Sequence, residues 1–113
     1  MVLERKVKDL IVLDVRAFSS FTDYIIIMTG TSDLHVIRTA QYIQEKLQEQ
    51  DSRPLGVEGV AEGRWVLLDY GEVVIHIFLE AVRLFYDLEG LWHDAPKQRY
   101  DEEGHVLAGD SRR

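Results

Sequence analysis

The sequence contains no cysteine, no long apolar run and no excess of basic residues, and each absence excludes a class of function. Without cysteine there is no disulfide, no zinc–thiolate site and no cysteine nucleophile, which fits a reducing compartment. No apolar run approaches the roughly 20 residues that a membrane-spanning helix needs. The first eight residues carry neither a signal-peptide core nor an Arg- and Ser-rich transit pattern, so we expect a cytoplasmic protein with no membrane partner.

The scarcity of positive charge limits the choice of partner. The formal net charge is -7, and an acidic domain is repelled by phosphate backbones and releases few counterions on meeting them. We therefore expect little direct nucleic-acid contact and favour a basic protein partner, because opposite charge speeds encounter and fixes orientation. Acidity also serves solubility alone in many proteins, and this alternative stays open.

Length and composition favour a single globular domain. The chain has 113 residues, of which 46% are hydrophobic and 29% charged, which suits one domain with one core. After Asp94 the composition becomes polar. We therefore expect a folded domain over residues 1–94 and a polar, flexible C-terminal tail over residues 95–113.

Apolar patterning predicts five strands and two helices. The strands are expected at residues 10–15, 23–30, 54–59, 65–70 and 73–79. Ser32 is the expected N-cap of a helix whose apolar stripe is Val36, Ile37, Ala40, Ile43 and Leu47. A second helix is expected over residues 80–92, with the stripe Val82, Phe85, Leu88 and Leu91. This order predicts an α/β fold with a mixed five-stranded sheet and flanking helices.

His76 interrupts the apolar strand of a predicted hairpin over residues 65–78, whose elbow contains Gly71. Alternation places Ile75 and Ile77 on one face of the sheet and His76 with Phe78 on the other. The face that carries His76 is therefore not uniformly apolar, and with Trp65 it is a candidate recognition surface. A histidine satisfied by a neighbour within the sheet is the alternative.

A catalytic site is not supported by the residues. The turn Thr29–Ser32 followed by a helix, together with Asp69, is faintly similar to nucleotidyltransferases, which hold magnesium between carboxylates at alternate strand positions. Leu67 and Gly71 occupy those alternate positions here, and Glu72 has the wrong parity. The histidines lack metal-ligand spacing and no serine lies in a G-x-S-x-G elbow. We expect no catalytic residue, no metal and no cofactor.

Five motifs occur in order over residues 9–94, and together they resemble the ribosomal silencing factor family, also called RsfS or Iojap-like. The motifs are Ser19–Tyr24, Thr29–Ser32 followed by His35 and Val36, Gly56–Gly59, Trp65–His76, and Leu88-Glu89 with Leu91-Trp92. The resemblance implies a nucleotidyltransferase-like α/β fold that has lost catalysis. It also implies binding to the large ribosomal subunit through ribosomal protein L-fourteen, which blocks joining of the small subunit and represses translation under nutrient limitation.

The runner-up function is a small nucleotide-binding or nucleotidyltransferase-type enzyme, which only the fold and the turn at Gly30 favour. An exposed docking surface also permits a homodimer of the free protein.

The partner-binding residues are expected at the end of the last hairpin and on the helix that follows it. Aromatic side chains beside acids suit a contact with a basic protein. The alternative, that Trp92 closes the core, stays open. The candidates are Asp69, Glu72, His76, Glu80, Tyr86, Glu89 and Trp92.

Overall fold

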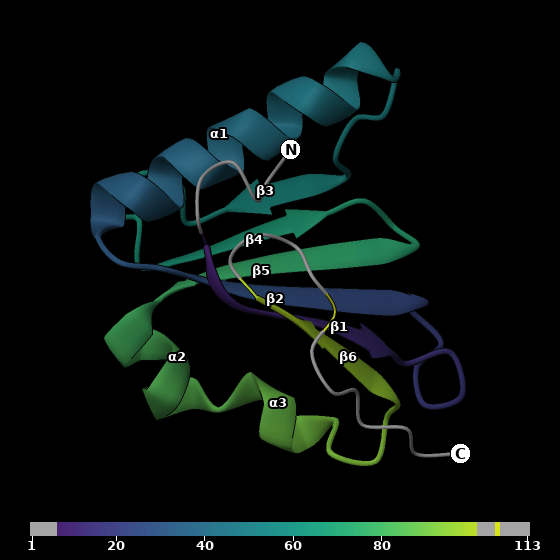
Figure 1. Cartoon of the computed structure of the whole chain (residues 1–113). Helices are drawn as coiled ribbons and strands as arrows, with labels where there is room; N and C mark the ends of the chain where they lie inside the picture. The colour runs from purple at the N-terminus through teal and green to yellow at the C-terminus, as the bar shows by residue number, and fades with distance from the viewer. Residues whose placement is uncertain (1–6, 102–105, 107–113) are drawn as a thin grey trace.

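A computed structural model describes residues 7–101 and 106, which form one sheet with helices on both of its faces (Figure 1). The elements in chain order are β1 (Lys8–Asp14), β2 (Tyr24–Gly30), α1 (Asp33–Glu49), β3 (Gly56–Glu58), β4 (Trp65–Asp69), β5 (Val73–Leu79), α2 (Glu80–Tyr86), α3 (Leu88–Leu91) and β6 (Lys97–Tyr100).

The sheet is mixed and has six strands in the order β3-β4-β5-β2-β1-β6. The central pair β2 and β5 is parallel, and every other neighbouring pair is antiparallel. A parallel pair needs a long connection, and α1 lies within the one between β2 and β5. The predicted mixed α/β sheet is confirmed, with one strand more than the five expected.

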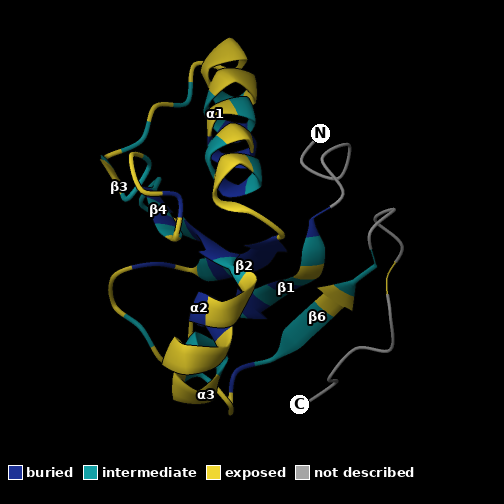
Figure 2. Cartoon of the chain, turned by 90° about the vertical axis from the view of Figure 1, so that its left-hand side faces the viewer, coloured by how far each residue is buried: buried dark blue, intermediate teal, exposed yellow. Residues whose placement is uncertain are grey.

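Two apolar clusters lie on opposite faces of the sheet, because side chains alternate along each strand. On one face, Val36, Ala40 and Ile43 of α1 pack with Ile75 and Ile77 of β5. On the other face, the cluster contains Ile11, Leu13, Ile27, Phe78 and Val82. Figures 1 and 2 show α1 on the first face and α2 with α3 on the second.

The start of α1 is set by local chemistry, as predicted. The Ser32 hydroxyl accepts a hydrogen bond from the backbone N–H of His35 at 3.0 Å, which caps the helix. Gly30 allows the strand end to approach the helix closely, since a Cβ there would lie 2.7 Å from Cγ2 of Val36.

The helix predicted over residues 80–92 is interrupted, and its predicted apolar stripe is wrong at two positions. Asp87 has a φ of 46° in the left-handed region, which ends α2 and redirects the chain into α3. Phe85 and Leu91 are 81% and 75% exposed, whereas Arg83 is buried beside Val82. The second helix therefore presents large apolar side chains to the surface.

Lys97–Tyr100 form the strand β6, although the sequence placed them in a flexible tail. They pair antiparallel with β1, and the backbone N–H of Asp14 donates to the carbonyl of Pro96 at 2.9 Å. Ala95, also assigned to that tail, is buried. An edge strand of four polar residues carries little apolar signal, which is why the pattern did not indicate it. The rest of the predicted tail, residues 102–105 and 107–113, lies outside the described residues.

Candidate functional site

Aromatic rings meet on the sheet face that carries α2. The Trp65 ring lies 4.8 Å from the Phe78 ring and 4.8 Å from the Tyr86 ring, measured between centroids. The Phe85 ring meets Tyr86 edge-on at 5.1 Å. Phe85 is 81% and Tyr86 52% exposed. We call Trp65, His76, Phe78, Phe85 and Tyr86 the aromatic face.

His76 is fixed within the aromatic face by Trp65. The indole N–H of Trp65 donates to Nδ1 of His76 at 3.0 Å, and the imidazole lies 6.1 Å from the Phe78 ring at an interplanar angle of 10°. His76 is only 7% exposed, and burial lowers its pKa to about 4. The imidazole is therefore neutral at physiological pH, and it has a partner within the sheet while belonging to the surface cluster.

The surface of α2 beside this cluster is a shallow groove. It is lined by Arg64, Ala81, Val82, Phe85 and Tyr86. Leu84 of the same helix is 79% exposed. Leu84 lines the neighbouring pocket around Arg83, so the groove itself owes its apolar surface to Phe85 and Tyr86. Exposed apolar surface marks sites where proteins meet other proteins or membranes.

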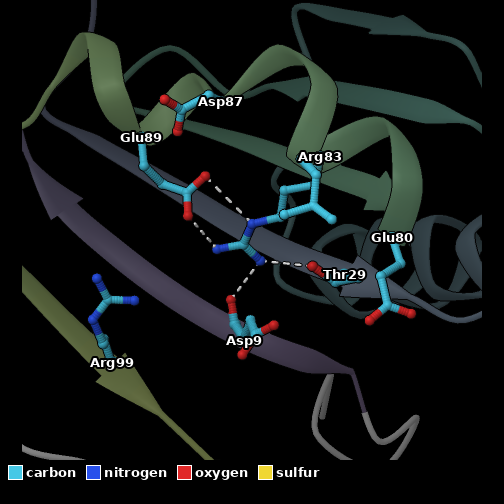
Figure 3. Close-up of a pocket in the computed structure, with 8 residues that line it drawn as sticks. Asp9, Thr29, Glu80, Arg83, Asp87, Glu89 and Arg99 are labelled. Atoms are coloured by element: carbon cyan, nitrogen blue, oxygen red, sulfur yellow. Dashed lines mark hydrogen bonds and ion pairs between the residues drawn. The ribbon is translucent and has the colours of Figure 1, made fainter.

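Arg83 holds the second helical segment against the sheet (Figure 3). Its guanidinium forms an ion pair with Glu89 at 2.9 Å and donates to the carbonyl of Asp9 at 2.7 Å and to Oγ1 of Thr29 at 2.6 Å. Burial alone would raise the pKa of Glu89, but the hydrogen bonds and charge of Arg83 lower it below its ordinary value. We call Arg83, Glu89, Thr29 and Asp9 the Arg83 cluster. Its hydrogen bonds are satisfied internally, which is typical of a structural role.

The seven predicted partner-binding residues do not form one site. His76 and Tyr86 lie in the aromatic face, and Glu80 begins α2 with its carboxylate 3.7 Å from the ammonium of Lys8. Glu89 belongs to the Arg83 cluster, and Trp92 is partly buried against the second apolar cluster.

Asp69 and Glu72 lie at the opposite end of the hairpin from Trp65. The Asp69 carboxylate accepts from the N–H of Gly71 at 2.8 Å, and the Glu72 carbonyl accepts from the N–H groups of Asp23 and Tyr24. Asp69 lies four residue steps along β4 from Trp65, which corresponds to roughly 13 Å. These two acids therefore belong to a turn that is separate from the aromatic face.

Two members of the aromatic face were not predicted as partner-binding residues. Trp65 appeared only as part of a possible recognition surface, and Phe85 was assigned to the core. Val82, Phe85 and Leu88 have the spacing of one helical stripe, so no local signal marked Phe85 as exposed. The break at Asp87, which the pattern did not show, decides its exposure.

The features that suggested nucleotidyl transfer have structural partners. Thr29 accepts from Arg83, Ser32 caps α1 and Asp69 caps the β4–β5 turn. No three His, Asp or Glu side chains converge on a metal-sized site within residues 7–101. Within the same range, no helix is both long and apolar enough to cross a membrane.

Sequence comparison identifies the family. The sequence model of the family described as "ribosomal silencing factor during starvation" matches residues 1–112. This chain belongs to the ribosomal silencing factor family. The match extends beyond residues 9–94, on which the motif resemblance rested, and includes β6.

Individual members of the family agree with this assignment. The ribosomal silencing factor RsfS of Bacillus subtilis is 39% identical over 93 residues, which cover 82% of this chain and 79% of the relative. The RsfS of Chromobacterium violaceum is 44% identical over 87 residues, covering 77% and 71%. A Chromobacterium violaceum protein with a crystal structure has a TM-score of 0.79 and 43% identity, covering 81% of this chain and 78% of that one. The relatives thus carry the name of ribosomal silencing factors, and the mixed α/β fold predicted for this chain is confirmed.

Proposed function

We propose that this ribosomal silencing factor binds the large ribosomal subunit in the cytoplasm through ribosomal protein L-fourteen. Bound there, it blocks joining of the small subunit by steric exclusion and represses translation under nutrient limitation. The single observation that carries the proposal is the aromatic face, because it is the surface best suited to a protein partner. Membership of the family supports the ribosome as that partner.

The aromatic face has the composition of an interface centre. Phe85 and Tyr86 expose 81% and 52% of their surface, and the Trp65 ring packs against the Tyr86 ring. Aromatic side chains are enriched at protein interfaces and in the few residues that contribute most of the binding energy. The Tyr86 ring already packs on Trp65 and therefore loses little conformational freedom on binding, which favours affinity.

Charge complements this apolar centre. The chain has a net charge of -7, and exposed Glu80 and Asp87 lie at the two ends of α2. These two acids line the pocket around Arg83, whereas Arg64 lines the groove beside Phe85 and Tyr86. The net negative charge of the chain favours a basic ribosomal protein over ribosomal RNA. Tyr86 is therefore the predicted contact that we place closest to the partner, and Glu80 stays a proposed contact at the start of α2. The other predicted contacts remain proposals and would lie at the edge of the interface: Asp69, Glu72, Glu89 and Trp92.

The same face offers an association surface when no ribosome is bound. We propose that the free protein can form a homodimer through it, which would compete with docking. Replacing Phe85 by Ala would then shift the protein towards the monomer in analytical ultracentrifugation.

We also propose that the protein catalyses no nucleotidyl transfer, since Asp69 caps a turn and no second carboxylate stands two residues away in either direction. Magnesium-dependent incorporation of labelled nucleotide that Asp69→Ala abolishes would contradict this.

The decisive experiment compares two exposed phenylalanines. Phe85 lies in the aromatic face, whereas Phe21 is 91% exposed in the loop between β1 and β2. Sedimentation with separated subunits should show the parent with the large subunit, and binding to isolated L-fourteen should give its affinity. Phe85→Ala should weaken binding by about 30-fold, since an interface anchor contributes about 2 kcal/mol, and Phe21→Ala should not. Migration with the small subunit alone, or equal loss in both variants, would refute the proposal.

A further inference from the structure

Trp65 determines which nitrogen of His76 carries the proton. An indole N–H can only donate, and it points at Nδ1 of His76 at 3.0 Å. Nδ1 must therefore present its lone pair, and a neutral imidazole then carries its single proton on Nε2. Protonation of Nδ1 would set two N–H donors against each other, so the same contact keeps the ring neutral.

The Nε2 atom of His76 has no partner among the described residues. Within that part of the chain, the hydroxyl of Tyr70 is the only fully buried side-chain nitrogen or oxygen that lacks a hydrogen bond. Among the described residues no acceptor takes a hydrogen bond from Nε2 of His76, so this atom must reach the surface even though the residue is 7% exposed. The aromatic face thus contains one outward N–H donor.

The surroundings of that donor are apolar. Leu67 of β4 and Ile27 of β2 stand directly opposite His76 in the two neighbouring strands, and Phe78 follows two residues along β5. A partner that covers this face removes water from the Nε2–H, and an N–H buried without an acceptor is costly. The docked surface must therefore supply an oxygen at this point. A carboxylate is disfavoured by the net charge of -7, which leaves an uncharged acceptor such as a backbone carbonyl.

We propose that His76 donates a hydrogen bond from Nε2 to an uncharged oxygen of the docked protein, and that Trp65 is the positioning residue that makes it a donor. This inference rests on the proposed function and specifies the recognition chemistry at its centre. The aromatic rings then supply apolar contact. His76 fixes how the partner is positioned on the face, because its single donor is satisfied only where the partner has an acceptor.

Two amide variants separate the nitrogens of the ring. In His76→Asn the amide lies near the Nδ1 position, so its oxygen can still accept from Trp65 while the outward donor is lost. In His76→Gln the amide nitrogen can lie near the Nε2 position, so the outward donor is kept. We expect His76→Asn to weaken binding to isolated L-fourteen by about tenfold and His76→Gln by less than about threefold. Circular dichroism checks that both variants are folded.

Nuclear magnetic resonance gives a second measurement, the position of the His76 proton, which does not depend on packing alone. Long-range proton–nitrogen spectra of the free protein should show the proton of His76 on Nε2, and binding of L-fourteen should shift and protect that proton. Equal binding by His76→Asn and the parent would overturn the proposal. Loss in both variants supports it if the Nε2 proton is protected on binding, and overturns it if that proton is unchanged. Failure of the parent to bind L-fourteen is a distinct result that overturns the proposed function together with this contact.

Discussion

Arg83 is the side chain whose loss should affect stability most clearly. Four hydrogen bonds of 2.6–3.4 Å join its guanidinium to Glu89, Thr29 and Asp9, and so connect α2 with α3, β2 and β1. The Arg83 side chain is 8% exposed, whereas that of Glu89 is 25% exposed. Replacement by Met keeps most of the volume but leaves the Glu89 carboxylate, the Thr29 hydroxyl and the Asp9 carbonyl without their donor.

Removing one partner of a buried ion pair destabilises a protein by about 3–5 kcal/mol. Glu89 reaches water and can be partly rehydrated, so we expect Arg83→Met to lie at the lower limit, about 3 kcal/mol. For a chain of this size that corresponds to a decrease of roughly 10 °C in Tm. The double variant Arg83→Met with Glu89→Leu should recover part of the loss, because the unpaired carboxylate is then absent.

Urea unfolding monitored by circular dichroism measures this change. Arg38→Met is the matched control, because Arg38 is exposed on α1 and its replacement should change the free energy of unfolding by less than about 0.5 kcal/mol. The reasoning is refuted if Arg83→Met unfolds within about 1 kcal/mol of the parent, or if adding Glu89→Leu recovers nothing.

Three further predictions follow from particular contacts. Burial lowers the pKa of His76 from 6.5 to about 4, so the unfolded chain binds a proton that the folded protein excludes. The contribution of neutral His76 to the free energy of unfolding should therefore be fully present above pH 6.5 and fall by about 3 kcal/mol as the pH decreases to 4. His76→Gln should reduce this pH dependence, measured by urea unfolding at each pH. Tyr70→Phe should be neutral or stabilise by about 1 kcal/mol in thermal unfolding, since the buried Tyr70 hydroxyl has no hydrogen-bond partner in the part of the chain that the structure describes; a clear loss would contradict this. Truncation after Asp94 removes β6 and buried Ala95 and should destabilise by about 2–4 kcal/mol in urea, whereas an unchanged midpoint would show that β6 contributes nothing.

The sequence alone determined the parts of this protein that depend on local chemistry. Ser32 can cap α1 because its hydroxyl reaches the N–H of His35 three residues later. The β4–β5 hairpin turns at Gly71, which has a φ of 85° that glycine adopts without strain. Alternation then placed His76 and Phe78 on one face, as the structure has them. The ordered motifs also indicated the family correctly.

The tertiary structure decided the features that depend on neighbours distant in the chain. The β6 strand is polar at the sheet edge, and only its pairing with β1 makes it a strand. The exposure of Phe85 follows from the break at Asp87 and from the burial of Arg83 in its place. Arg83 in turn is held by Asp9 and Thr29, which lie 74 and 54 residues away in sequence. A buried arginine is stable only where such partners converge, and no local pattern of residues encodes that convergence.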